Sequence, residues 1–172
     1  MFTAYIGLGS NLNNPQQQIV QACSEIADLE DVRLVRMSSL YRSSPMGPMG
    51  QPDYVNAVAE IATNLTPESL LNELQRIENE HGRTRNGIRW GARTLDLDVL
   101  IYGEEVINTK TLTIPHPGLY ERAFVLYPLK EIAPDDLRIP GHGKLAGLVS
   151  RCERGDLELI STVSLNNNDK QT

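Results

Sequence analysis

Residues 95–101 read LDLDVLI, an apolar run that carries two aspartates, and this run decides the fold assignment. In an extended strand the side chains of residues i and i+2 point to the same face, so Asp96 and Asp98 are expected side by side. The opposite face is formed by the apolar residues that alternate with them, Leu95, Leu97 and Val99. The pattern therefore predicts a strand that packs on helices with one face and presents two carboxylates on the other.

Two neighbouring carboxylates repel each other, by roughly 2–3 kcal/mol at about 6 Å and an effective dielectric near 20. A divalent cation removes that repulsion, and Mg²⁺ is often held by one or two carboxylates together with substrate phosphates. A solvated strand face is the alternative interpretation, and it is the more frequent one for an isolated D-x-D pattern. The pair alone does not decide between the two.

The residues before the aspartates favour the metal interpretation. Four arginines fall within eleven residues there, in a chain whose net charge is −6, and the only tryptophan, Trp90, lies among them; the four are Arg83, Arg85, Arg89 and Arg93. Guanidinium groups match phosphate oxygens with two parallel hydrogen bonds. The combination predicts a site for a metal ion and a polyphosphate.

The remaining sequence predicts alternating strands and helices. Asn14 and Thr66 each precede a proline, which is typical of a helix start, and these helices are expected to end near Leu29 and Gly82. Extended segments are expected over Thr3–Leu8, which ends in a turn at Gly7–Asn11, and over Val32–Tyr41 and Tyr54–Asn64. Loops are expected at Ser43–Pro52 and 83–94. A hairpin is expected at Glu105–Ile114 and a short helix at 122–133.

This order, β-α-β-β-α-β with additional C-terminal elements, predicts an α+β fold of the ferredoxin-like split βαβ sandwich type. Helices are expected on one face of the sheet, with the other face left for the site. We expect a single domain over residues 1–162 and a disordered tail over 163–172.

Composition excludes several classes of protein. The net charge of −6 argues against general nucleic-acid binding, which needs a basic face. The two cysteines, Cys23 and Cys152, are too far apart for a disulfide scaffold or a zinc site. No secretory signal or membrane-length apolar run is visible, so a cytoplasmic protein without membrane contact is expected. We also expect the protein to be a monomer. The sequence also lacks the P-loop pattern, and Gly7-Leu8-Gly9 does not continue into a dinucleotide fingerprint.

Four stretches resemble one family closely, the 6-hydroxymethyl-7,8-dihydropterin pyrophosphokinases of folate biosynthesis. They are AYIGLGSNL (4–12), SSPMGPMGQPDYVNAV (43–58), RIENEHGRTRNGIRWGARTLDLDVLIYG (76–103) and LTIPHPGLYERAFVLYPLKEIAP (112–134). The resemblance covers about residues 3–140. It implies the ferredoxin-like fold, ATP and Mg²⁺, and transfer of a whole diphosphate to the pterin hydroxymethyl group with release of AMP.

The resemblance also implies roles for individual residues. Asp96 and Asp98 match the ligands of two Mg²⁺ ions, and Arg83 and Arg93 match arginines that stabilise the transferred group. ATP is expected to contact Gln75, Glu78, Arg85, Trp90, Arg93, Val99, Lys110, Leu112, Thr113, His116 and Arg122. The pterin is expected to contact Ser43, Ser44, Met46, Tyr54, Asn56, Trp90, Asp96 and Phe124, with Tyr54 and Phe124 stacking on its two faces.

The chain departs from the family pattern at a few positions. Ser44 stands where proline is frequent, Lys110 where arginine is frequent, and Pro117-Gly118 where many relatives have Pro-Arg. Residues beyond about 141, including His142 and Cys152, receive no role.

Two other classes of protein would share part of this pattern. A ferredoxin-like RNA-binding module would need a basic sheet with exposed aromatic side chains. A nucleotidyltransferase would keep the two aspartates but would not need Asn56 between stacking rings. Product analysis separates the enzymes, because diphosphate transfer releases AMP whereas nucleotidyl transfer releases pyrophosphate.

Overall fold

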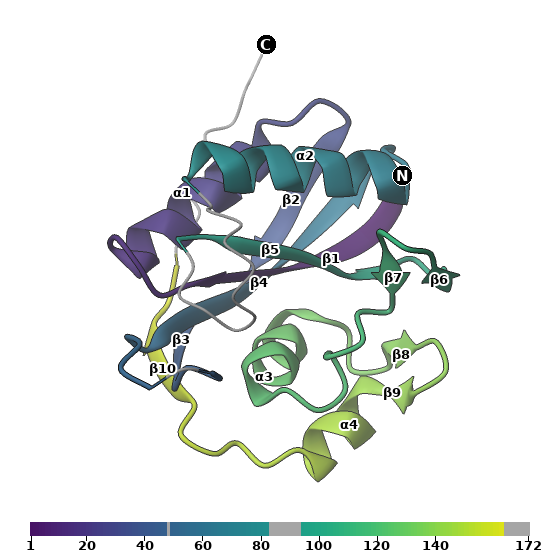
Figure 1. The fold of residues 1–172 in the computed structure, drawn as a ribbon. Helices are drawn as coiled ribbons and strands as arrows, with labels where there is room; N and C mark the ends of the chain where they lie inside the picture. Colours follow the sequence, from purple (N-terminus) through teal and green to yellow (C-terminus); the bar gives the residue numbers. More distant parts are fainter. Residues whose placement is uncertain (48, 83–93, 164–172) are drawn as a thin grey trace.

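The computed structural model describes residues 1–47, 49–82 and 94–163. They fold around a sheet of antiparallel strands in the order β10-β3-β4-β1-β5, with β2 also paired to β4 (Figure 1). Its strands are β1 (Phe2–Ser10), β2 (Val32–Met37), β3 (Leu40–Ser43), β4 (Tyr54–Thr63), β5 (Asp96–Tyr102) and β10 (Glu158–Ser161). The predicted α+β, ferredoxin-like class is confirmed, and β5 with its two aspartates is the last strand of the order.

Helices α1 (Pro15–Ala27) and α2 (Pro67–Glu80) cover one face of the sheet (Figure 1). Leu97 and Val99 of β5 are buried in the core beneath them, as the alternation in the sequence predicts. Thr66 caps α2, because its side chain accepts a hydrogen bond from the Ser69 N–H. Helix α1 begins at Pro15 after the N-cap residue Asn14, as the sequence predicts, but Asn14 has a positive φ of 61° and makes no side-chain capping bond.

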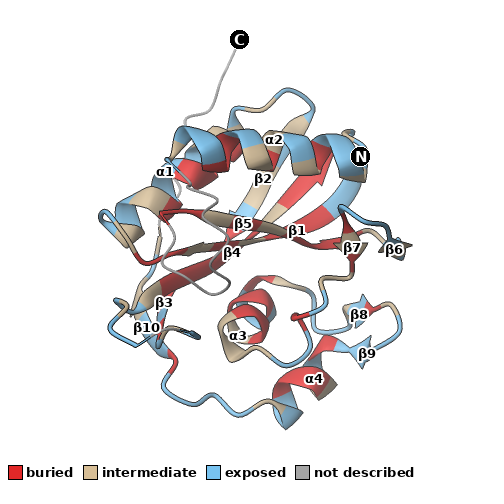
Figure 2. Cartoon of the chain, in the orientation of Figure 1, coloured by how far each residue is buried: buried red, intermediate tan, exposed pale blue. Residues whose placement is uncertain are grey.

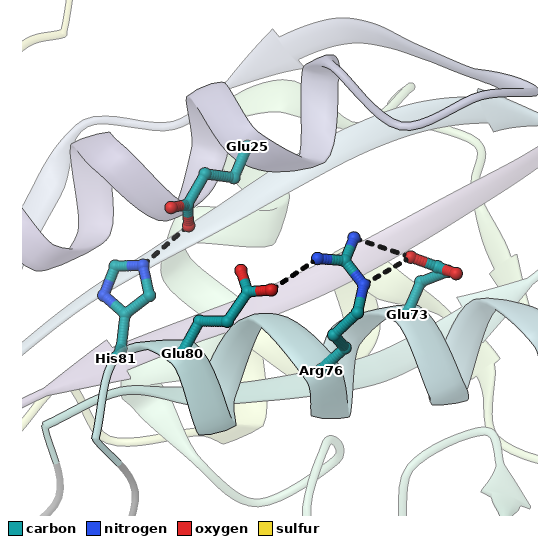
Figure 3. A network of polar contacts seen from close by, with 5 residues as sticks. All are labelled: Glu25, Glu73, Arg76, Glu80 and His81. Carbon is teal, nitrogen blue, oxygen red and sulfur yellow. Dashed lines mark hydrogen bonds and ion pairs between the residues drawn. The ribbon is translucent and has the colours of Figure 1, made fainter.

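The end of α2 is tied to α1 by a buried histidine (Figure 3). His81, whose side chain is 4% exposed, places Nε2 2.6 Å from Glu25 Oε2, and its Nδ1 contacts the side chain of Gln18. Along α2, Arg76 bonds Glu73 and Glu80 at 2.8 Å. Those pairs lie within α2, are exposed and contribute little to stability, whereas the His81–Glu25 contact joins the two helices.

The other face of the sheet is covered as well. There α3 (Ala123–Ile132) packs on the sheet, and α4 (Leu145–Arg151) packs on α3. A second core that includes Tyr5, Val58 and Leu100 joins these layers (Figures 1 and 2). The expectation of helices on one face only is therefore wrong, because the apolar side chains of the second face need cover as well. The predicted helix at 122–133 is confirmed as α3, and it leaves only part of the face free.

Strand boundaries differ from the sequence pattern in two places. β1 continues through Gly7 and Gly9 to Ser10, where a turn is expected from the sequence. The extended segment 32–41 breaks at Ser38 and Ser39, because Ser38 Oγ accepts the Val58 N–H and the Ser39 N–H donates to the Glu131 carboxylate of α3. Contacts from distant parts of the chain thus end β2 and begin β3.

Short strand pairs complete the structure. The expected hairpin is confirmed as β6 (Ile107–Asn108) paired with β7 (Thr113–Ile114), and β8 (Arg138–Ile139) pairs with β9 (Gly143–Lys144). Val163 packs against the core, whereas the rest of the expected tail lies outside the described residues. Within the described ranges, no helix has both the length and the apolar composition that a membrane crossing needs.

Candidate active site

A cavity lies between the sheet and the N-terminal end of α3. Its walls come from β1, the end of β3, β4, β5 and the segment that leads into α3, which are far apart in the sequence. The lining residues are Gly7, Leu8, Gly9, Ser43, Ser44, Met46, Tyr54, Asn56, Ala57, Val58, Asp96, Asp98, Leu100, His116, Arg122, Phe124 and Val125. The lining includes all of the described residues that the sequence predicts to contact the pterin. It also includes two of the residues predicted to contact ATP, His116 and Arg122.

Glycines of β1 make room for this cavity. Gly9 pairs with Asn56 of β4 on one side and with Asp96 of β5 on the other, and Gly7 pairs with Asp98. A Cβ atom on Gly9 would lie 3.7 Å from Asn56 Oδ1 and 3.8 Å from Tyr54 Cδ1. The missing side chain therefore leaves a floor of bare backbone between the amide of β4 and the carboxylate of β5.

Asn56 is held in a defined orientation. Its side chain is buried, and Nδ2 donates to Ser43 Oγ at 2.8 Å. Oδ1 consequently lies on the side of Gly9, where the cavity floor is. An amide fixed in this way offers donor and acceptor atoms to a planar ring with a mixed polar edge.

Asp96 and Asp98 line the cavity from β5 and are both partly exposed. No group of three or more His, Cys, Asp and Glu side chains that could hold a metal comes together in the described residues. Two carboxylates without a protein cage are the donor set that suits Mg²⁺, which completes its shell with water and substrate phosphates. The residues present therefore fit this ion.

His116 stands beside these carboxylates, with Nε2 3.8 Å from Asp98 Oδ1. Burial lowers the pKa of His116 below its ordinary value of 6.5, the Arg122 charge lowers it further, and Asp96 opposes both. The Gly118 N–H donates to Nδ1 at 3.1 Å, so the proton of the neutral ring is on Nε2. The ring thus presents an N–H donor toward the carboxylate side of the cavity.

Arg122 occupies space that Gly118 leaves free. A Cβ atom on residue 118 would overlap the Arg122 guanidinium. That guanidinium also lies 5.9 Å from the ring centre of Phe124. In this arrangement the Arg122 guanidinium occupies the space beside Gly118 and lines the cavity.

Most other ATP candidates lie on β5 itself or on the elements next to it, α2 and the β6–β7 pair. The buried Glu78 of α2 accepts the Leu97 N–H through Oε2 at 3.1 Å, between the two aspartates. The side chains of Val99 and Leu112 are buried in the core, so only their main chains are available to a ligand. The remaining described candidates are Gln75 on α2, Lys110 in the β6–β7 turn and Thr113 in β7.

Four candidates lie outside the described residues, namely Arg83, Arg85, Trp90 and Arg93. Their roles stay predictions from the sequence.

Sequence reasoning missed two buried polar residues next to the cavity, Ser10 and Asn11. The Ser10 hydroxyl donates to the Thr94 carbonyl, and Asn11 Nδ2 donates to the Pro52 carbonyl at 3.0 Å. They fix the chain just before β5 and just before β4. A serine and an asparagine at the end of a buried strand were the available signal, but the sequence gives no indication of their distant partners.

Comparisons with known proteins identify the family of this chain. The family model of 7,8-dihydro-6-hydroxymethylpterin-pyrophosphokinase matches residues 5–134. The 2-amino-4-hydroxy-6-hydroxymethyldihydropteridine pyrophosphokinase of Haemophilus influenzae is 55% identical over 151 residues, covering 88% of this chain and 93% of the relative. That of Pseudomonas aeruginosa is 49% identical, covering 91% and 95%.

Solved structures show the same fold at low identity. A crystal structure of wild-type Plasmodium falciparum HPPK-DHPS superposes with a TM-score of 0.67 at 13% identity, covering 87% of this chain. This chain spans only 44% of that longer protein, so the match concerns the fold alone. Taken with the extensive match to the family model and the bacterial relatives, the chain belongs to the 7,8-dihydro-6-hydroxymethylpterin-pyrophosphokinase family of enzymes.

Proposed function

We propose that the cavity is where this chain transfers diphosphate from ATP to the hydroxymethyl group of 6-hydroxymethyl-7,8-dihydropterin, releasing AMP. One observation carries the assignment: the amide of Asn56 and the carboxylates of Asp96 and Asp98 line one cavity, from strands on either side of Gly9. The acceptor and the metal-bound phosphates would then meet above β1.

The pterin would occupy the part of the cavity near β4. Asn56 would bind the amino-pyrimidinone edge, because Ser43 fixes its amide in place. Tyr54 and Phe124, which line the same cavity, would stack on the ring faces. The bare backbone at Gly9 would let a flat bicycle lie close to the sheet.

The carboxylates would hold Mg²⁺ at the other end of the cavity. Asp96 and Asp98 are the proposed ligands of two ions, as in the family. When bound, the ions neutralise the charge of the triphosphate and align it for in-line attack on the β-phosphorus.

The chain itself would bind and orient ATP. The neutral His116 ring would donate its Nε2–H to phosphate oxygens, and the guanidinium N–H groups of Arg122 would donate to them as well. The main chain of Val99 at the outer edge of β5 would contact the nucleotide, together with α2 and the β6–β7 turn. Arg83 and Arg93 are proposed to stabilise the transferred group.

Mass analysis of the products tests the reaction. Incubation with ATP, Mg²⁺ and the pterin is expected to give AMP and a pterin heavier by a diphosphate. Release of free pyrophosphate with an adenylylated acceptor would contradict the proposal and point to nucleotidyl transfer instead.

We propose further that the enzyme acts as a cytoplasmic monomer that binds no nucleic acid. Its net charge of −6 is unfavourable for phosphate backbones. Light scattering during size exclusion is expected to give the monomer mass of 19.1 kDa. A mass of twice that value would contradict the monomer.

A further inference from the structure

The C-terminal part of the chain extends the sheet beside the cavity. β10 pairs with β3, with Leu159 opposite Tyr41 and Glu158 opposite Arg42. β3 ends at Ser43, whose hydroxyl accepts the hydrogen bond from Asn56. A strand outside the range of the family model, which ends at residue 134, therefore supports the strand that orients the central amide of the cavity.

A side-chain contact continues this support beyond the end of β3. The Ser44 hydroxyl donates to Oδ2 of Asp156, two residues before β10. Ser44 lines the cavity and begins the segment 44–53, which contains no helix or strand in its described part. Asp156 thus holds the cavity segment at its first residue.

Asp156 is itself carried on a fixed piece of chain. Next to it, Arg154 Nε donates to the Leu157 carbonyl at 3.0 Å, and its guanidinium lies 5.7 Å from the ring centre of Tyr127 on α3. The Tyr127 hydroxyl donates to the Cys152 carbonyl at 3.0 Å, and the Leu157 side chain is buried. The carboxylate is therefore presented from a place determined by α3 and the core.

We propose that Asp156, carried by the segment that leads into β10, is a positioning residue for the end of the cavity that we assign to the pterin. By holding Ser44, Asp156 sets the backbone of 43–46 before the pterin binds, so less conformational freedom is lost on binding. This inference rests on the proposed assignment of the cavity to the pterin. Asp156 does not line the cavity, so its action on the pterin is indirect.

Binding titrations test the inference. Pterin is titrated in the presence of Mg²⁺ and a saturating non-hydrolysable ATP analogue, and the analogue is titrated separately. We expect Asp156→Ala and Ser44→Ala each to weaken pterin binding about three- to tenfold, the scale of one hydrogen bond, without changing the affinity for the analogue. Because both changes remove the same contact, the double variant should be no weaker than either single variant.

Matched variants exclude a general effect on the fold. Glu158→Ala removes another exposed carboxylate of the same segment, paired with Arg42 at 3.5 Å and absent from the cavity lining, and should leave both affinities unchanged. Asp156→Asn keeps an acceptor oxygen and should retain pterin affinity close to that of the unmodified chain.

Three results would overturn the inference: full pterin affinity in Asp156→Ala, an equal loss for the ATP analogue, or additive losses in the double variant. Asn56→Ala separates this failure from failure of the cavity assignment. If Asn56→Ala weakens pterin binding while Asp156→Ala does not, only the role of Asp156 is lost. If neither variant weakens it, the assignment of the cavity to the pterin falls as well.

Discussion

Replacing Gly9 by alanine is expected to stabilise the fold and weaken pterin binding at the same time. Gly9 lies inside β1, paired on both sides, and its φ lies outside the left-handed range. The added methyl group would make ordinary contacts, 3.7 Å from Asn56 Oδ1 and 3.8 Å from Tyr54 Cδ1. The protein without ligand therefore has room for it, but the methyl group stands on the floor of the cavity.

The two effects have opposite signs and can be given magnitudes. Glycine inside a strand costs about 0.5–1 kcal/mol relative to alanine, so the variant should melt about 1–4 °C higher. A methyl group forced against a closely packed ring costs about 1–3 kcal/mol. That cost corresponds to roughly 5- to 150-fold weaker pterin binding.

Calorimetric melting and pterin titration with Mg²⁺ and a non-hydrolysable ATP analogue measure the two effects on one preparation. Gly147→Ala in α4 is the matched control, because its new Cβ would lie 3.6 Å from Arg151 Nη1 and far from the cavity lining. It should raise stability without changing pterin affinity. Unchanged pterin affinity in Gly9→Ala would refute the assignment of the cavity floor, and a lower melting temperature would refute the claim of free space at Gly9.

Other predictions follow from the carboxylates and from His116. Asp96→Ala or Asp98→Ala should reduce turnover more than a hundredfold, roughly the scale of a lost group at the reacting centre. The melting temperature should stay the same or rise, because repulsion between the two carboxylates is relieved. Initial rates near those of the unmodified chain would contradict a metal role. Glu78→Ala leaves the Leu97 N–H without its carboxylate acceptor and should cost about 1–3 kcal/mol, or roughly 2–12 °C, whereas Glu78→Gln should cost less; an unchanged melting temperature would show that this bond is unimportant. His116 should titrate below 6.5 by NMR. The pKa of His116 is lower in the folded than in the unfolded chain. Its contribution to the free energy of unfolding is therefore fully present above pH 6.5 and decreases as the pH falls from there toward the folded pKa. Titration above 6.5 would contradict the buried, neutral ring.

Local patterns in the sequence were sufficient for the elements that position the site. The alternation around Asp96 and Asp98 predicts a strand with one apolar and one acidic face. Which residues lie on each face is determined by the two-residue period of a strand alone. The Thr66-Pro67 start of α2 is likewise local, because the cap and the proline act within one turn.

Features that depend on distant partners could not be predicted in this way. The break between β2 and β3 is produced by Val58 and Glu131, which approach only in the folded chain. The helices on the second face cover Tyr5 and Leu100, whose burial no local period reveals. The contact of Ser44 with Asp156 joins residues 112 positions apart, and nothing near either residue indicates it.

The central claim, that one cavity binds the pterin at Asn56 and the metal-bound phosphates at Asp96 and Asp98, is tested most directly by a crystal structure. The crystal should contain this chain with Mg²⁺, a non-hydrolysable ATP analogue and 6-hydroxymethyl-7,8-dihydropterin. The account predicts a pterin between the Tyr54 and Phe124 rings, its polar edge on the Asn56 amide, and Mg²⁺ coordinated by both aspartates. A pterin bound outside this cavity, or Mg²⁺ without either carboxylate among its ligands, would contradict it.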